Sequence, residues 1–116
     1  MSEAKQFTNK QINLITATIA SSGTKSTAIN VYGASAGAMY IPASFTGTTV
    51  TFEGSCDDGT TFKAITNSLG NAVSQTIIAD TWHTLDPQIF YPYDQIKIVA
   101  ASQGAERTIL VKPFSI

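Results

Sequence analysis

Apolar and polar residues alternate with a period of two along most of this 116-residue chain. The clearest example is residues 49–56, where Val50, Phe52 and Cys56 fall on one side and threonines and a glutamate on the other. Such alternation is typical of a β-strand with one face in the core and one in solvent. The segment therefore predicts a half-buried strand with Phe52 in the core.

Seven further segments have strand character, and turns rich in glycine, asparagine, aspartate and serine separate them. They are residues 12–19, 25–31, 38–42, 61–65, 73–78, 95–101 and 107–113. The turn at Asp57, Asp58 and Gly59 predicts a hairpin between 49–56 and 61–65, and a second hairpin is predicted between 95–101 and 107–113. About eight strands predict an all-β fold, a two-sheet antiparallel sandwich, because each sheet must bury its apolar face on the other.

Two segments depart from the strand pattern. Asp86 as a capping residue and Pro87 at the first helical position predict a single helical turn over 86–90. Residues 1–10 are polar and have no periodicity, and Phe7 is their aromatic side chain. We therefore expect an N-terminal arm at 1–10 and one sandwich domain at 11–116, with the arm held by a neighbouring subunit or surface rather than by its own core.

Charged residues make up 13% of the chain and the net charge is −1, whereas hydrophobic residues make up 43%. The chain is too apolar for a disordered protein, and it has too little positive charge to favour a nucleic acid as partner. No apolar run is long enough to predict a membrane-spanning segment, and the first ten residues lack the apolar stretch of a signal peptide. We expect neither a nucleic-acid nor a membrane partner.

Few residues offer catalytic or metal-binding chemistry. Cys56 and His83 are the only cysteine and the only histidine, so a nucleophile–base pair would need these two side chains together. The acidic turn at Asp57 and Asp58 suggests calcium, but the spacing of an EF-hand is absent and a hairpin explains the turn equally well. We expect a protein that is not an enzyme and has no cofactor, and leave open whether this turn binds an ion.

The aromatic residues around position 90 are the most distinctive local feature. A loop containing Phe90, Tyr91 and Tyr93 follows shortly after Trp82. Such side chains plug the end of a core, enter protein interfaces or stack on sugars, and the sequence leaves these three interpretations open. Together with the arm they form our set of candidate interface residues, which is Phe7, Trp82, Phe90, Tyr91 and Tyr93.

Eight stretches, in this order and spacing, carry a resemblance to a known family. They are IASSG (19–23), STAINVYG (26–33), YIPASFTG (40–47), VTFEGS (50–55), DGTTF (58–62), TLDP (84–87), IKIVAAS (96–102) and RTILVKP (107–113). In these stretches the chain resembles the small jelly-roll decoration, or cement, proteins of tailed-bacteriophage heads. The first ten residues fall outside the resemblance, and the aromatic run at 90–93 is heavier than the family pattern.

The resemblance implies a jelly-roll type of sandwich and a structural role in a virion. It implies binding to the outer surface of an assembled phage head, after synthesis in the bacterial host cytoplasm. The implied partners are the major capsid protein, whose neighbouring capsomers would be cemented, and further copies of the chain itself. A closed homo-oligomer follows from the family, and we expect a trimer before a dimer.

Two other functions remain to be weighed against this one. A carbohydrate-binding sandwich module of a phage tail or a secreted protein would use exposed aromatic residues such as Trp82, Tyr91 or Tyr93. A hydrolase would need Cys56 and His83 within hydrogen-bonding reach of each other. The fold alone does not separate these functions, because sandwiches serve all of them.

Overall fold

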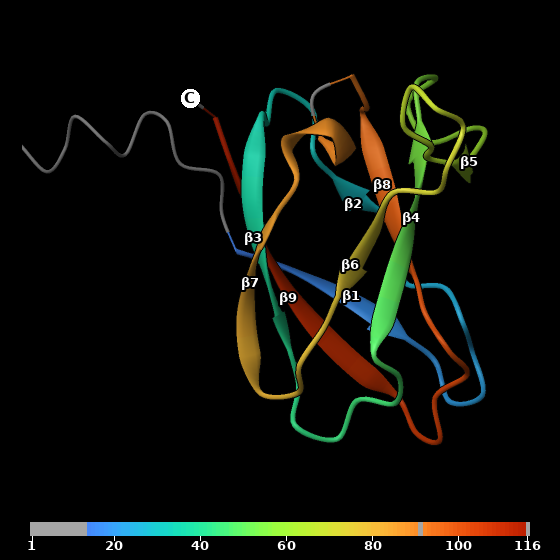
Figure 1. Ribbon diagram of the computed structural model, residues 1–116, viewed down its shortest axis with the longest axis vertical. Coiled ribbons are helices and arrows are strands. Elements are labelled where there is room, and N and C mark those ends of the chain that lie inside the picture. The colour runs from blue at the N-terminus through green and yellow to red at the C-terminus, as the bar shows by residue number, and fades with distance from the viewer. Residues whose placement is uncertain (1–13, 91, 116) are drawn as a thin grey trace, which may run out of the picture.

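A computed structural model describes residues 14–90 and 92–115 as two antiparallel β-sheets packed face to face (Figure 1). The strands are β1 (Ile15–Ile19), β2 (Ile29–Asn30), β3 (Ala36–Ile41), β4 (Thr49–Ser55), β5 (Lys63–Ala64), β6 (Ser74–Thr76), β7 (Thr81–Leu85), β8 (Gln95–Val99) and β9 (Arg107–Phe114). One 3₁₀ turn, η1 (Pro87–Ile89), precedes β8. Residues 1–13, 91 and 116 lie outside this description, so the predicted arm at 1–10 stays a prediction.

The order of strands in the two sheets is that of a jelly roll. One sheet has the order β1-β9-β3-β7, and the other has the order β2-β8-β4-β5 with β6 also paired to β4. The chain crosses from one sheet to the other at nearly every connection, and only β4, β5 and β6 follow one another within a sheet. The all-β, two-sheet antiparallel sandwich of jelly-roll type is thereby confirmed.

The core lies between the sheets and consists mainly of branched aliphatic side chains. Phe52 is 2% exposed, which confirms the position predicted from the alternation of β4. Ile98 of β8 stands opposite it in the same sheet, and both strands alternate buried and half-buried positions. The largest fully buried side chains in the described part are Phe90, Ile19, Ile29, Met39, Ile41, Ile89, Ile96, Ile98, Ile109, Gln103, Val31 and Val50.

Two local predictions are confirmed. β5 returns antiparallel beside β4, with Glu53 opposite Ala64, as the aspartate–glycine turn predicts. The helical turn begins after Asp86, whose carboxylate accepts a hydrogen bond of 3.0 Å from the backbone N–H of Gln88. Both features depend on residues close together in the chain, which is why the sequence predicts them.

The predicted hairpin between residues 95–101 and 107–113 is wrong. β8 pairs with β2 and β4, whereas β9 pairs with β1 and β3, so the two strands belong to different sheets. Their connection is anchored by the buried side chain of Gln103, which accepts a hydrogen bond from the N–H of Thr46 and donates one to its carbonyl, each 2.9 Å long. Because of these tertiary contacts, the loop between β8 and β9 crosses from one sheet to the other and does not form a hairpin turn.

Three further expectations need correction. The strand β7 is missing from the predicted strands, because its sequence, TWHTL, is polar and short, yet it pairs along its whole length with β3. The predicted strand at 25–31 is reduced to β2, with only isolated bridges at Lys25 and Ser26. Cys56 is exposed and does not share the buried face of Phe52, because β4 ends at the buried Ser55 and the chain then turns.

Candidate functional site

The outer face of the four-stranded sheet carries a row of side chains in register. Thr16 of β1 stands opposite Leu110 of β9, which stands opposite Tyr40 of β3, which stands opposite Trp82 of β7. Their chain neighbours Met39 and Val111 are fully buried, so alternation directs the row away from the core. We call these four residues the outer row, and Trp82 is its most exposed large side chain, at 52%.

Tyr40 and Trp82 form an aromatic pair within the outer row. Their ring centroids are 5.5 Å apart and the rings are tilted by 53°. The Tyr40 hydroxyl donates a hydrogen bond to the Asp80 carboxylate, and this bond, followed by burial, raises the pKa of Tyr40. Asp80 itself has a φ of 58° in the turn before β7. The turn therefore holds the tyrosine ring, and the tyrosine supports the tryptophan as a preformed aromatic surface.

The surroundings of the outer row are poor in charge. The outward positions beside it, by register and alternation, are Thr18, Thr108, Ala38, Thr84 and Lys112. Lys112 is the charged residue of this group, and the Asp80 carboxylate on the Tyr40 hydroxyl is a second charge beside the row. Covering a surface of hydroxyl, methyl and aromatic groups costs less desolvation energy than covering charges, provided that the partner satisfies the hydroxyl groups with hydrogen bonds.

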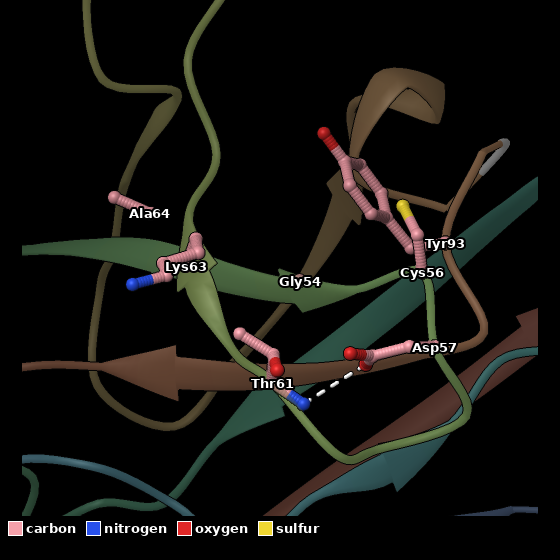
Figure 2. Close-up of a pocket in the computed structure, with 7 residues that line it drawn as sticks. All are labelled: Gly54, Cys56, Asp57, Thr61, Lys63, Ala64 and Tyr93. Carbon is pink, nitrogen blue, oxygen red and sulfur yellow. Dashed lines mark hydrogen bonds between the residues drawn. The ribbon is translucent and has the colours of Figure 1, made fainter.

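A hollow of about 350 Å³ lies at one end of the other sheet, where β4 ends and β8 begins (Figure 2). We call it the β4–β8 hollow, and it is lined by Gly54, Cys56, Asp57, Thr61, Lys63, Ala64 and Tyr93. The ring of Tyr93 packs on Gly54 so closely that a Cβ atom there would lie 2.6 Å from Cδ1 of the ring. Only a glycine at position 54 leaves room for this ring.

The turn between β4 and β5 fixes the carboxylate of Asp57 in the wall of the hollow. Its Oδ1 accepts hydrogen bonds from the Ser55 hydroxyl, at 2.7 Å, and from the Thr61 backbone N–H, at 2.9 Å. These bonds, that of Ser55 foremost, lower the pKa of Asp57. The Ser55 hydroxyl also accepts from the Gly59 N–H at 2.8 Å, so the whole turn is built around it. Asp57 is thus ionised at neutral pH and held in place.

A second hollow, of about 380 Å³, is lined by Asn30, Tyr32, Asp58 and Asp94, of which the two aspartates follow Asp57 and Tyr93 of the first hollow in the chain. Asp94 accepts a hydrogen bond of 3.0 Å from the backbone N–H of Asp58, which ties the loop before β8 to the turn after β4. Within residues 14–90 and 92–115, no group of three or more histidine, cysteine, aspartate or glutamate side chains is arranged to hold a metal ion. Asp57 and Asp58 therefore do not form part of such a group in the described residues.

The structure separates the residues that the sequence grouped together. Trp82 lies on the outer face of the four-stranded sheet, whereas Tyr93 lines the β4–β8 hollow. Phe90 is fully buried and contacts the backbone at Gly37, so it belongs to the core and is withdrawn as an interface candidate. Phe7 and Tyr91 lie outside the described residues.

Cys56 and His83 also stand apart and have separate partners. Cys56 follows β4 in one sheet, and its Sγ is 3.7 Å from the carbonyl oxygen of Pro92. His83 belongs to β7 in the other sheet, and its Nε2 accepts a hydrogen bond of 3.1 Å from the N–H of Ile78. The predicted requirement for a Cys56–His83 pair is therefore not met, because the two residues belong to different sheets.

Sequence reasoning missed most of the residues that these surfaces use. Tyr40 and Leu110 join Trp82 only through the pairing of β3, β7 and β9, which no local pattern encodes. Thr61 and Lys63 were placed on a strand but not in a hollow. The sequence does show which side chains of each predicted strand are exposed. These residues could have been grouped into one surface only if the order of the strands in the sheet had also been known.

Comparisons with protein-family models, with curated proteins and with solved structures found no match for this chain. In the described residues there is no helix with the length and apolar character needed to cross a bilayer.

Proposed function

We propose that this protein binds the outer surface of an assembled phage head and cements neighbouring capsomers, with the major capsid protein as its partner. The observation that supports it best is the outer row on a jelly-roll sandwich, where a preformed aromatic pair, Tyr40 and Trp82, has only Asp80 and Lys112 as charged neighbours among the described positions around it. The family resemblance of the sequence points in the same direction. The protein is then a virion component rather than an enzyme.

The outer row suits a contact with a protein surface for two physical reasons. Tryptophan and tyrosine bury large areas at low entropic cost, and such residues dominate the energetics of many interfaces. Tyr40 is already fixed by Asp80, so little side-chain freedom is lost when the pair is covered. Threonines around the row add short hydroxyl groups that hydrogen-bond without the desolvation cost of a charge.

Many copies of the same contact on one capsid strengthen the overall binding of an oligomer. A capsid offers many equivalent sites, and a closed oligomer that spans several of them gains affinity from each without a new type of interface. We propose a homo-oligomer, a trimer before a dimer, seated on a local symmetry axis of the shell. Light scattering coupled to size-exclusion chromatography of the full chain measures this directly.

The proposal is tested by co-sedimentation of the full chain with expanded, undecorated heads from a panel of tailed phages. The expected result is saturable binding to at least one type of head. Trp82→Ser should then weaken binding at least about tenfold, the scale of a residue central to an interface. The matched control is Leu69→Ser, because Leu69 is 83% exposed and lies in the loop between β5 and β6, away from the outer row.

Both variants change exposed side chains, so their unfolding midpoints should stay close to that of the wild type. Binding to none of the heads, or equal loss in the Trp82 and Leu69 variants, would contradict the proposal. The alternative, a carbohydrate-binding sandwich, is favoured by the exposed ring of Trp82. It predicts retention on a polysaccharide resin that is lost in Trp82→Ser, without any binding to heads.

A further inference from the structure

The β4–β8 hollow has no part in the proposed contact with a capsid. The outer row lies on β1, β9, β3 and β7, whereas the hollow is formed by β4, the turn after it, β5 and the loop before β8. A contact through the outer row therefore leaves the hollow open to a ligand of its own.

One wall of the hollow is an aromatic ring in a fixed position. Tyr93 is half-buried, and its ring packs against the Cα of Gly54. Figure 2 shows the phenol standing beside Cys56, with its hydroxyl directed away from the strand. A ring that is held on one side and open on the other is a stacking surface for the C–H groups of a ligand.

The opposite wall is polar and carries both a hydrogen-bond acceptor and a donor. The carboxylate of Asp57 is bonded by the Ser55 hydroxyl and by the backbone and side chain of Thr61, and since a carboxylate has about four acceptor positions, about one remains for a ligand. Lys63 is exposed, and its ammonium forms no ion pair within the described residues. Figure 2 shows Thr61 beside Asp57, and Lys63 on β5 with its ammonium turned away from the Tyr93 ring, so the lysine side chain must swing inward to reach a ligand.

The hollow carries charges of both signs, so neither an anion nor a cation is favoured by both walls. The carboxylate of Asp57 opposes phosphate, sulfate or carboxylate groups, and its chain neighbour Asp58 adds to this. Lys63 at the rim opposes a cationic group. A neutral molecule that both donates and accepts hydrogen bonds can bond to the carboxylate and to the ammonium. The volume of about 350 Å³ is enough for a single six-membered ring with its substituents.

We propose that the β4–β8 hollow binds a neutral hexopyranose unit, with one apolar sugar face on Tyr93 and hydroxyl groups bonded to Asp57 and Lys63. A pyranose has an apolar face of C–H groups and a rim of hydroxyls, which is the complement of these two walls. The same protein would then hold a glycan at the end of one sheet and a protein surface on the face of the other.

The test is a titration of the ¹⁵N-labelled full chain, followed by two-dimensional NMR, with glucose, galactose, mannose and N-acetylglucosamine in turn. We expect saturable shifts for at least one sugar, with a millimolar dissociation constant, confined to the amides of Gly54, Cys56, Thr61 and Lys63. Asp57→Asn and Lys63→Ala should each weaken that binding at least fivefold. Tyr32→Ser is the matched control, because Tyr32 is 76% exposed and lines the other hollow, and it should change the constant less than twofold.

Three outcomes would overturn the assignment. One is the absence of saturable shifts with all four sugars. The second is a set of shifts centred on Trp82 and Tyr40, which would place sugar binding on the outer row instead. The third is unchanged binding in both Asp57→Asn and Lys63→Ala; Lys63→Ala changes an exposed side chain that makes no hydrogen bond in the β4–β5 turn, so its effect on binding is separate from turn stability. None of these results bears on binding to phage heads, which the co-sedimentation experiment measures separately.

Discussion

Gly54 lies directly against the ring of Tyr93, at a distance that excludes any side chain. A Cβ atom at position 54 would be 2.6 Å from Cδ1 and 2.9 Å from Cε1 of the ring. Gly54 is buried in β4, and Tyr93 precedes β8, its neighbour in the sheet. The contact joins the end of β4 to the loop that closes the β4–β8 hollow.

Gly54→Ala should therefore destabilise the protein by about 1–3 kcal/mol, because the added methyl group displaces the ring or the strand. The free energy of unfolding in denaturant measures the effect. Gly104→Ala is the matched control, since no atom lies within 4 Å of its Cβ position and its φ needs no glycine. If the two alanine variants were equally stable, the packing of Tyr93 on Gly54 would be refuted.

Asp57 makes the stability of the β4–β5 turn depend on pH. Its pKa is lowered in the folded protein, by the Ser55 hydroxyl foremost and then by Thr61, so the folded state binds this proton more weakly than the unfolded chain. The stabilisation is complete above the unfolded pKa, about 3.9, and is lost as the pH falls through the lower folded value.

We expect the difference in unfolding temperature between wild type and Asp57→Asn to be largest near neutral pH and to shrink below about pH 4. Thermal unfolding between pH 7 and pH 2 measures it. Asp58→Asn serves as control, because the Asp58 carboxylate makes no hydrogen bond within the described residues. A constant difference between wild type and Asp57→Asn across this range would show that the carboxylate is not held by Ser55 and Thr61.

Phe52 is central to the core, and its truncation tests the register of β4. The ring is 2% exposed and stands opposite Ile98. Phe52→Ala should cost about 3–5 kcal/mol of unfolding free energy, because it removes buried apolar area and leaves a cavity. Denaturant unfolding measures the loss, and a value below about 1 kcal/mol would mean that the strand lies in another register.

Cys56 and His83 should be replaceable without loss of function. They lie on different sheets and have separate partners, the Pro92 carbonyl and the Ile78 N–H. Cys56→Ser and His83→Ala should leave the dissociation constant for phage heads within about threefold of the wild type, which is a change of about 0.7 kcal/mol or less in binding free energy. Abolished function in either variant, with circular dichroism showing a folded protein, would reopen the enzymatic interpretation.

Features that depend on neighbouring residues followed from the sequence. The alternation of β4 predicted that Phe52 is buried, Asp57 to Gly59 predicted the hairpin with β5, and Asp86 with Pro87 predicted the turn η1. In each case the local backbone preference and the hydropathy of the residues agree with the final fold. The sandwich class follows from the number of such strands.

Tertiary structure alone decided which strands are partners and which side chains meet. The sequence predicts that the strand at 107–113 pairs with the strand at 95–101 in a hairpin, but β9 pairs in the other sheet. The alternation of apolar and polar residues shows which face of a strand is buried, and it does not show which strand lies beside it. The polar segment Thr81–Leu85 became a strand only through its pairing with β3, which also set Trp82 beside Tyr40. The outer row and the β4–β8 hollow exist for the same reason: their residues are distant in the chain, and the sheet order brings them together.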